Sequence, residues 1–253
     1  MPERLPSERI KHLEILRNKE LKCILHLIPD TSRLLEIGAG AGWQALALQN
    51  KGFQVDAIDL AGSTLGRHAQ FPLKIYDGRQ LPFRDNEFDV IFSSNVLEHI
   101  PHIDEIHLEM QRVLKPDGLA IHILPTTAWR FWTSMGHPLW VFRRLLEVAR
   151  NRHGNTPPGA IRIPAPHRAR WRYLFWPNRH GETGNSLTEL YWFSRRAWRR
   201  QFETNNWKIV QVKPVGLFYT GNQILHRHIA MKMRGWLSRF VGSATCIYVL
   251  KRG

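Results

Sequence analysis

Residues 33–42 read RLLEIGAGAG, and the amphipathic segment Trp43–Lys51 follows them directly. The order is an apolar strand, a turn with three alternating glycines, and a helix. Glycine permits positive φ angles and lets a ligand approach the main chain, while the next helix presents free N–H groups. The stretch therefore predicts a turn that binds a nucleotide-like group. A tight turn without a ligand is the alternative.

A second strand is expected at Gln54–Leu60, and its Asp59 lies 21 positions after Gly38. An acid at that distance can accept hydrogen bonds from both hydroxyls of a ribose. The dinucleotide fingerprint G-x-G-x-x-G would require glycine at position 43, where Trp43 stands instead, so a pyrophosphate is disfavoured. Together, the turn and the acid indicate an adenosine-like ligand.

The order of five sequence features resembles that of the class I S-adenosylmethionine-dependent methyltransferases, in particular those similar to methyltransferase type 11. These features are LEIGAGAG, Asp59, YDGRQLPF, FDVIFSSNVLEHI and RVLKPDGLAIHIL. The resemblance covers residues 30–125 closely. It is looser at Trp207–Val215 and Thr245–Leu250, which are similar to the family's last two antiparallel strands. It implies an enzyme (EC 2.1.1.-) whose cofactor is S-adenosyl-L-methionine.

The resemblance also assigns residues to the cofactor. Those expected around its methionine part are Glu36, Gly38, Ala39, Gly40 and Gly42; Asp59 is expected on the ribose, Asp77 with Gly78 near the adenine amino group, and Asn95 on the sulfonium side. Asp77-Gly78 is equally typical of an ordinary turn. Asp89 is expected to be structural.

Two histidines are candidate catalytic bases. His99 follows Asn95-Val96-Leu97-Glu98 just after a strand, at the edge where open α/β sheets bind ligands, and an imidazole pKa of about 6.5 suits proton transfer. His180 lies in the polar loop RHGETGN, where the resemblance implies a histidine facing the acceptor. The alternatives are that His99 and Glu98 merely fix the following helix and that the loop is a linker. Some relatives hold a divalent metal with a similar Glu-His pair and further acids, but Asn95 occupies one such position, so no metal is expected.

Charge divides the chain into two unlike halves. Residues 1–124 contain 14 basic and 17 acidic side chains, whereas residues 125–253 contain 22 basic and 4 acidic ones and nine of the ten tryptophans. Residues 126–185 are too long for an ordinary strand-to-helix connection and are expected to form an insertion between the fifth and sixth strands. The basic half is therefore expected to contact the acceptor or a partner.

An amphipathic basic helix is expected after Pro138 in this insertion. Its apolar positions are Leu139, Phe142, Leu145, Leu146 and Ala149, opposite Arg143, Arg144 and Arg150. Such a helix either docks its apolar face on the domain or lies on an anionic membrane surface. Further along, residues 157–166 are expected to be an extended linker.

The aromatic and basic run at 167–173 makes RNA the main rival partner. RNA is the less favoured one, because neither Cys23 nor Cys246 lies where attack on a pyrimidine is expected, and SSNV is not an Asn-Pro-Pro-Tyr type box. Ser194 is expected to cap a helix at residues 195–204.

We therefore expect one α/β domain over residues 1–253, with a doubly wound, seven-stranded, mostly parallel Rossmann-like sheet and an antiparallel last strand. The expected reaction is methyl transfer to oxygen of a small-molecule, glycan or lipid-linked acceptor. RNA methylation and a non-catalytic cofactor-binding scaffold are the alternatives. Two cysteines without CxxC spacing, and no apolar run of about 18 residues, predict a cytoplasmic protein that can lie peripherally at the inner membrane surface.

Overall fold

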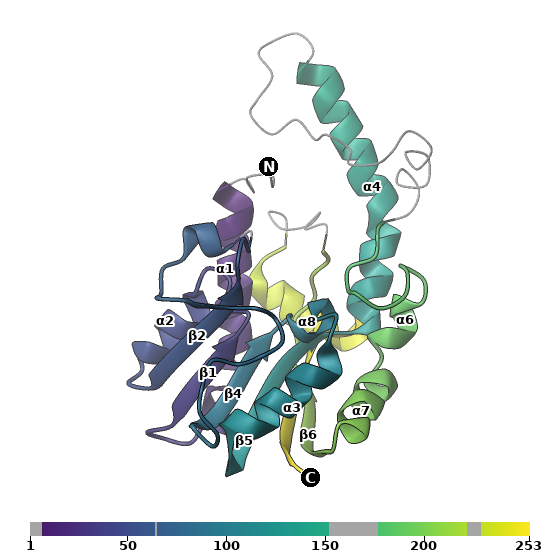
Figure 1. Cartoon of the computed structure of the whole chain (residues 1–253). Coiled ribbons are helices and arrows are strands. Elements are labelled where there is room, and N and C mark those ends of the chain that lie inside the picture. The colour runs from purple at the N-terminus through teal and green to yellow at the C-terminus, as the bar shows by residue number, and fades with distance from the viewer. Residues whose placement is uncertain (1–6, 64, 152–176, 222–228) are drawn as a thin grey trace.

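The computed structural model of the chain describes residues 7–63, 65–151, 177–221 and 229–253 (Figure 1). Seven strands form one sheet in the order β3-β2-β1-β4-β5-β7-β6. Their bounds are β1 Arg33–Ile37, β2 Gln54–Leu60, β3 Lys74–Tyr76, β4 Phe88–Ser94, β5 Leu114–Pro125, β6 Trp207–Pro214 and β7 Thr245–Arg252.

The sheet is parallel except at β7, which is antiparallel to both of its neighbours, β5 and β6. The predicted doubly wound sheet with an antiparallel last strand is therefore confirmed. The order of strands reverses between β1 and β4, where Ile37 lies opposite Ser93. Ligands of open α/β sheets bind where the order reverses, outside the carboxyl ends of the strands. The glycine turn after β1 and residues 95–99 after β4 therefore meet at this edge.

Side chains of β7 show that helices cover both faces of the sheet. Thr245 Oγ1 donates to Glu20 Oε1 of helix α1 (Ser7–Lys22) at 2.9 Å, whereas the Tyr248 ring packs on Phe202 of helix α7 (Arg195–Thr204) with centroids 5.4 Å apart. Residues three apart on a strand point to opposite faces. Helices α1 and α7 therefore cover opposite faces (Figure 1).

The remaining helices are α2 Trp43–Gln49, α3 Ile103–Val113, α4 Thr127–Asn151, α6 Glu189–Trp192 and α8 Met231–Val241, with single 3-10 turns at Leu25–Leu27, Gly66–His68 and Leu97–His99. Helix α7 begins where it was predicted, because the Ser194 side chain accepts a hydrogen bond from the Ala197 N–H as its N-cap. Helix α1 ends at Lys22, and a 3-10 turn follows.

The expected start of the insertion helix at Pro138 is wrong, because α4 begins at Thr127 and continues through Pro138. Proline removes one helical hydrogen bond, but the preceding turns are anchored on the body of the protein. The Trp129 side chain is buried, and Trp132 Nε1 donates to the Val241 carbonyl at 2.9 Å. Figure 1 shows α4 rising away from the sheet at the edge where β5 ends.

The apolar face of α4 is not docked on the domain at the positions that the structure describes. Leu139, Phe142 and Leu146 are all exposed. No helix in the described ranges is long and apolar enough to span a bilayer. The predicted linker at 157–166 and the aromatic, basic run at 167–173 lie outside the described residues, so the insertion as a whole stays a prediction.

Candidate functional site

The glycine turn after β1 adopts the left-handed backbone conformation at three positions. Gly38, Gly40 and Gly42 have φ angles of 69°, 58° and 72°. A Cβ on Gly38 would lie 2.5 Å from Val96 Cγ2, and one on Gly42 would lie 2.6 Å from the Cβ atom of Phe71. Ala39 and Ala41, the intervening residues, are buried. Glycine is therefore required both by the turn and by the close packing of the segments beyond β2 and β4.

Asp59 is buried at the end of β2 and is tied directly to this turn. Its Oδ2 accepts a hydrogen bond from the Gly40 N–H at 2.9 Å, and its Oδ1 accepts one from the Leu60 N–H at 2.8 Å. A carboxylate oxygen has lone pairs for further donors. Asp59 is therefore held at the edge of the turn, where a ribose could donate to it.

Glu36, at the end of β1, is buried and its Oε2 has no hydrogen-bond partner among the described residues. Burial, together with the nearby Asp59, raises the pKa of Glu36 to about 8. The indole Nε1 of Trp43 is also buried without a partner. A buried carboxylate at a glycine turn suits the ammonium group of S-adenosyl-L-methionine, so these residues fit the expected cofactor.

The other expected cofactor residues are placed less distinctively. Asp77 is exposed, and its Oδ1 accepts from the N–H groups of Arg79 and Gln80, both at 2.8 Å, which is an Asx-type turn with Gly78 at φ 84°. Asn95 has a φ of 56° and precedes Val96, the residue that packs on the glycine turn. Asp89 is structural, as expected, because it accepts from the Arg33 N–H.

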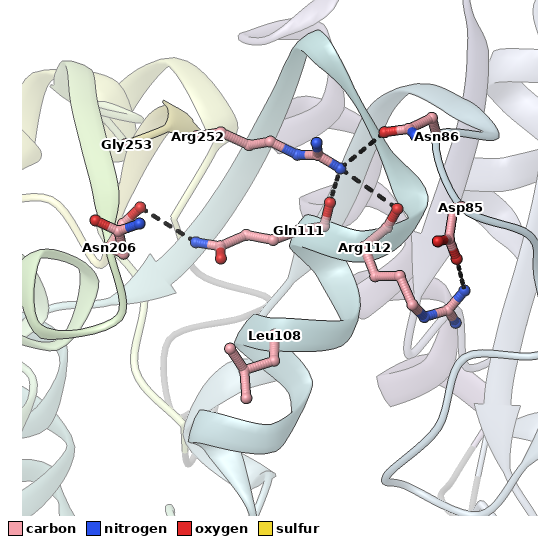
Figure 2. Close-up of a pocket in the computed structure, with 8 residues that line it drawn as sticks. All are labelled: Asp85, Asn86, Leu108, Gln111, Arg112, Asn206, Arg252 and Gly253. Atoms are coloured by element: carbon pink, nitrogen blue, oxygen red, sulfur yellow. Dashed lines mark hydrogen bonds and ion pairs between the residues drawn. The ribbon is translucent and has the colours of Figure 1, made fainter.

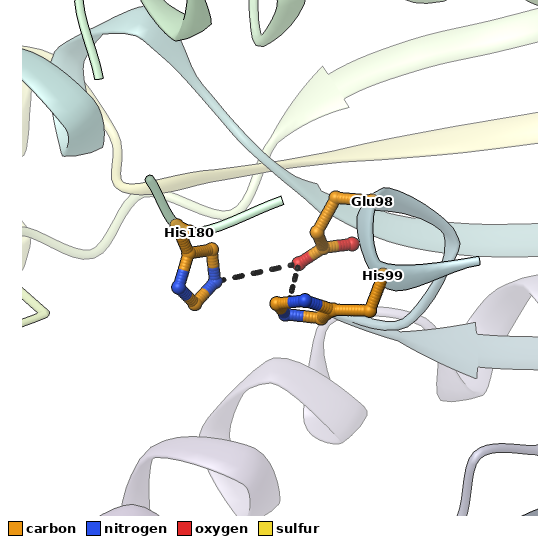
Figure 3. Close-up of side chains that lie close together, drawn as sticks. All are labelled: Glu98, His99 and His180. Carbon is orange, nitrogen blue, oxygen red and sulfur yellow. Dashed lines mark ion pairs between the residues drawn. The ribbon is translucent and has the colours of Figure 1, made fainter. Parts of the chain in front are cut away.

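The two candidate bases meet at one carboxylate, although 81 positions separate them in the sequence. Figure 3 shows one oxygen of Glu98 between the imidazoles of His99 and His180. The Nε2 atom of each histidine lies 3.9 Å from Glu98 Oε1, and the ring centroids of the two histidines are 4.5 Å apart. The imidazoles are partly exposed, whereas the Glu98 side chain is fully buried behind them.

The loop that carries His180 is fastened to two other elements. Glu189 of α6 accepts with its Oε1 from the N–H groups of His180 at 2.5 Å and Gly181 at 2.7 Å, and the Glu182 N–H donates to the Glu98 carbonyl at 2.8 Å. The ring of Trp129, from α4, packs on the His180 ring with centroids 4.5 Å apart. The position of His180 therefore depends on α4 and α6.

Burial controls the protonation of this cluster. It lowers the pKa of His180 to about 3, with the neighbouring His99 adding to the effect, and it also lowers the pKa of His99. Burial raises the pKa of Glu98 to about 8. At neutral pH both imidazoles are therefore uncharged and have a nitrogen lone pair available.

Three residues that build the site, Glu98, Arg130 and Glu189, were not predicted as site residues from the sequence. Glu98 was expected at most to fix a helix, yet both of its carboxylate oxygens are buried and lack a hydrogen-bond partner in the described ranges. Arg130 is fully buried, with its Nε 3.1 Å from Glu189 Oε2. The Glu-His pair was the only sequence signal for this cluster, because burial of residues so far apart is set by tertiary packing.

A hollow lies at the opposite edge of the sheet, near the amino ends of the parallel strands (Figure 2). Its lining residues are Asp85, Asn86, Leu108, Gln111, Arg112, Asn206, Arg252 and Gly253. The Arg252 guanidinium donates to Asn86 Oδ1 and to the carbonyls of Gln111, Arg112 and Leu114. Arg252 thus joins β7 to α3 and to the start of β5, and the hollow lies away from the glycine turn.

Comparison with known proteins agrees with this geometry. A family model described as a methyltransferase domain matches residues 10–212. An uncharacterized methyltransferase of Mycobacterium tuberculosis is 36% identical over 113 residues, which are 41% of this chain and 43% of that protein. The biotin biosynthesis bifunctional protein BioHC of Cellvibrio japonicus is 36% identical over 96 residues, 36% of this chain and 19% of that protein. The chain thus matches less than half the length of these curated relatives.

Solved structures show the same fold at low identity. A methyltransferase of Haloferax volcanii, in complex with the Trm112 activator, superposes with a TM-score of 0.55 at 14% identity, covering 97% of this chain and 94% of that one. An S-adenosylmethionine-dependent methyltransferase of Aquifex aeolicus gives 0.51 at 14% identity, covering 98% of each chain. The chain therefore belongs to the methyltransferase domain family, and S-adenosyl-L-methionine is its cofactor.

Proposed function

We propose that the protein methylates an oxygen atom of a small-molecule, glycan or lipid-linked acceptor at the cluster formed by Glu98, His99 and His180. The observation that carries this proposal is the pair of uncharged, partly exposed imidazoles of His99 and His180. His99 follows Val96, the residue that packs on the glycine turn, by three positions. A hydroxyl acceptor of high pKa needs a base more than a nitrogen or thiol acceptor does.

In this proposal Glu36, Gly38, Ala39, Gly40, Gly42 and Asp59 hold the cofactor, with Asp77, Gly78 and Asn95 at its margins. Support comes from the unpartnered Glu36 oxygen and from the hydrogen bond between Asp59 and the turn. When bound, S-adenosyl-L-methionine supplies a methyl group on a positively charged sulfur. The protein's contribution is then to align the acceptor oxygen and to exclude water, which can account for about 7–11 kcal/mol of a barrier.

His99 is the better base of the two histidines, because the pKa of His180 is lowered as far as about 3. In the proposed step the acceptor oxygen forms a bond to the methyl carbon while the methyl–sulfur bond breaks. The hydroxyl proton passes to His99 Nε2, and His180 Nε2 orients the oxygen. Because burial lowers the pKa of His99 below its ordinary value of about 6.5, we expect turnover to persist below that pH and to fall only when His99 becomes protonated.

The acceptor chemistry can be tested with S-adenosyl-L-methionine that carries a labelled methyl group. The protein is incubated with aqueous and organic fractions of a cell extract, and the labelled product is identified by NMR. We expect an O-methyl product and a decrease in turnover of about 10²–10⁴-fold for His99→Gln. His102→Gln, a change in the exposed His102–Glu105 pair, is the matched control. Label only on nitrogen or carbon, or full activity in His99→Gln and His180→Gln, would refute the proposal.

The exposed apolar stripes on α4 and α8 support a lipid-linked acceptor over an aqueous one. The stripe on α4 consists of Phe131, Met135, Leu139, Phe142 and Leu146, and that on α8 consists of Met233, Trp236 and Phe240. The bond from Trp132 to the Val241 carbonyl joins the two helices. Lys232 and Arg239 are exposed on α8 beside its stripe. Apolar rings flanked by cations are the composition of elements that lie on anionic membranes.

Vesicle flotation at about 0.15 M salt tests this placement. We expect binding to vesicles that contain phosphatidylglycerol, weaker binding to pure phosphatidylcholine, and a loss of binding for Phe142→Ser combined with Phe240→Ser. Leu108→Ser changes an equally exposed leucine on α3 and should leave flotation unchanged. Retention of RNA but not of vesicles would favour the RNA alternative and refute the membrane placement.

A further inference from the structure

We propose that Glu98, His99 and His180 form a binding site for a divalent transition-metal ion, with Zn²⁺ as the ion that their donor atoms fit best. This differs from the expectation, based on Asn95, that the chain has no metal site. The binding itself does not depend on the acceptor, whereas a role for the ion in catalysis rests on the proposed function.

The buried carboxylate of Glu98 is the first observation. Its side chain has no exposed surface, and neither oxygen has a hydrogen-bond partner in the part of the chain that the structure describes. Buried polar atoms in proteins are almost always partnered, so an orphaned carboxylate calls for a donor or a cation. The nearby Arg17 does not meet this need, because its Nη1 pairs with Glu20 Oε2 at 2.6 Å.

The geometry of the three side chains is the second observation. One donor atom from each residue can be chosen so that all three lie within 4.8 Å of one another, and Oε1 of Glu98 is 3.9 Å from each Nε2 (Figure 3). Zn²⁺ bonds of about 2.0–2.2 Å in a tetrahedral site place ligand atoms about 3.3–3.6 Å apart. Closing this gap requires a shift of about 1 Å, which side-chain rotations of two partly exposed imidazoles can supply.

The identity of the donors selects the ion. Two imidazole nitrogens and one carboxylate oxygen are a ligand set of catalytic zinc sites, whereas Mg²⁺ and Ca²⁺ prefer oxygen ligands alone. Three protein ligands leave a coordination position open on the solvent side of the cluster. With the ion bound, an acceptor oxygen at that position would lose its proton to water more easily; without the ion, His99 Nε2 takes the proton, as proposed above.

The backbone around the ligands keeps the two ligand segments together before any ion binds. The Glu182 N–H donates to the Glu98 carbonyl at 2.8 Å, and Glu189 Oε1 accepts from the His180 N–H. The conformational entropy lost in bringing His180 next to Glu98 is therefore already lost when the chain folds. A site that is already assembled in this way binds its ion with little further ordering.

The test is calorimetric titration of Zn²⁺ into the full chain after treatment with a chelator, with Co²⁺ as a second probe read by its visible absorption. We expect one equivalent to bind, an absorption spectrum typical of tetrahedral or five-coordinate Co²⁺, and weak or no binding of Mg²⁺. His180→Ala and Glu98→Gln should weaken Zn²⁺ by at least about 100-fold. His102→Ala, in the surface His102–Glu105 pair, is the matched control and should bind Zn²⁺ as the wild type does.

Binding of S-adenosylhomocysteine by the same samples reports that each variant is folded. If one variant does not fold, the other and His99→Ala carry the comparison. No saturable Zn²⁺ binding by the wild type, or equal binding by all cluster variants, would overturn the metal site while leaving the methyltransferase proposal intact. Zn²⁺ binding without any O-methyl product would instead refute the proposed function and leave the metal site standing.

Discussion

Replacing Arg130 with methionine should destabilise the protein strongly, because its guanidinium is fully buried between α4 and the loop that carries His180. Arg130 Nε lies 3.1 Å from Glu189 Oε2 and donates to the Ser186 carbonyl at 3.1 Å, and Nη2 donates to the Asn178 carbonyl at 3.1 Å. Methionine occupies a similar volume but leaves the Glu189 carboxylate buried without its cation. Removal of one partner of a buried ion pair costs about 3–5 kcal/mol.

Urea denaturation of wild type and Arg130→Met, followed by circular dichroism, measures this loss. For a chain of this size it corresponds to a fall in melting temperature of roughly 6–20 °C. Arg179→Met is the matched control, because the Arg179–Glu182 pair in the same segment is 53% and 42% exposed and should contribute less than about 1 kcal/mol. If Arg130→Met lies within about 1 kcal/mol of the wild type, the buried pair does not hold this loop.

Three further changes test the rest of the fold. Burial lowers the pKa of His122 to about 3. Below pH 6.5 the unfolded chain binds a proton that the native state excludes, so the free energy of unfolding should fall as the pH drops, by about 2 kcal/mol at pH 5. Equal pH dependence of wild type and His122→Phe in urea titrations would contradict this. Gly38→Ala should lower the free energy of unfolding by about 1–3 kcal/mol, because φ is 69° and the new Cβ would lie 2.5 Å from Val96. Gly52→Ala should cost less, because its Cβ would meet nothing within 4 Å. Melting curves that rank the two variants in reverse would be inconsistent with the packing of the turn. Ser194→Ala removes the N-cap of α7 and should cost about 1 kcal/mol, so an unchanged urea midpoint would show that the cap is dispensable.

Much of the fold could be predicted because its signals are local. The apolar runs of the strands, the glycines at 38, 40 and 42, and the spacing to Asp59 each reflect short-range requirements of the backbone. Pro138 was misleading for the same reason: it is a local break signal, whereas the buried Trp129 holds the preceding turns in a helix.

The site could be predicted only in part. His99 and His180 were both candidates from their positions after a strand and in a polar loop, but nothing in the sequence indicates that they share Glu98. Their meeting depends on the contact between Arg130 and Glu189, which lie 59 positions apart in the sequence (189 − 130) and are brought together by tertiary packing. Arg130 in particular stands between Trp129 and Phe131 in the sequence, and a basic side chain is by default expected at the surface.

Calorimetric titration of S-adenosylhomocysteine into the wild type and Asp59→Ala tests most directly whether the cofactor lies between the glycine turn and this carboxylate. Two hydrogen bonds to a carboxylate contribute about 1.5–3 kcal/mol each, so Asp59→Ala should weaken binding by at least about 100-fold. Asp117→Ala, an exposed acid on β5, should bind as the wild type does. Absence of binding by the wild type, or equal affinity in Asp59→Ala, would contradict this placement of the cofactor.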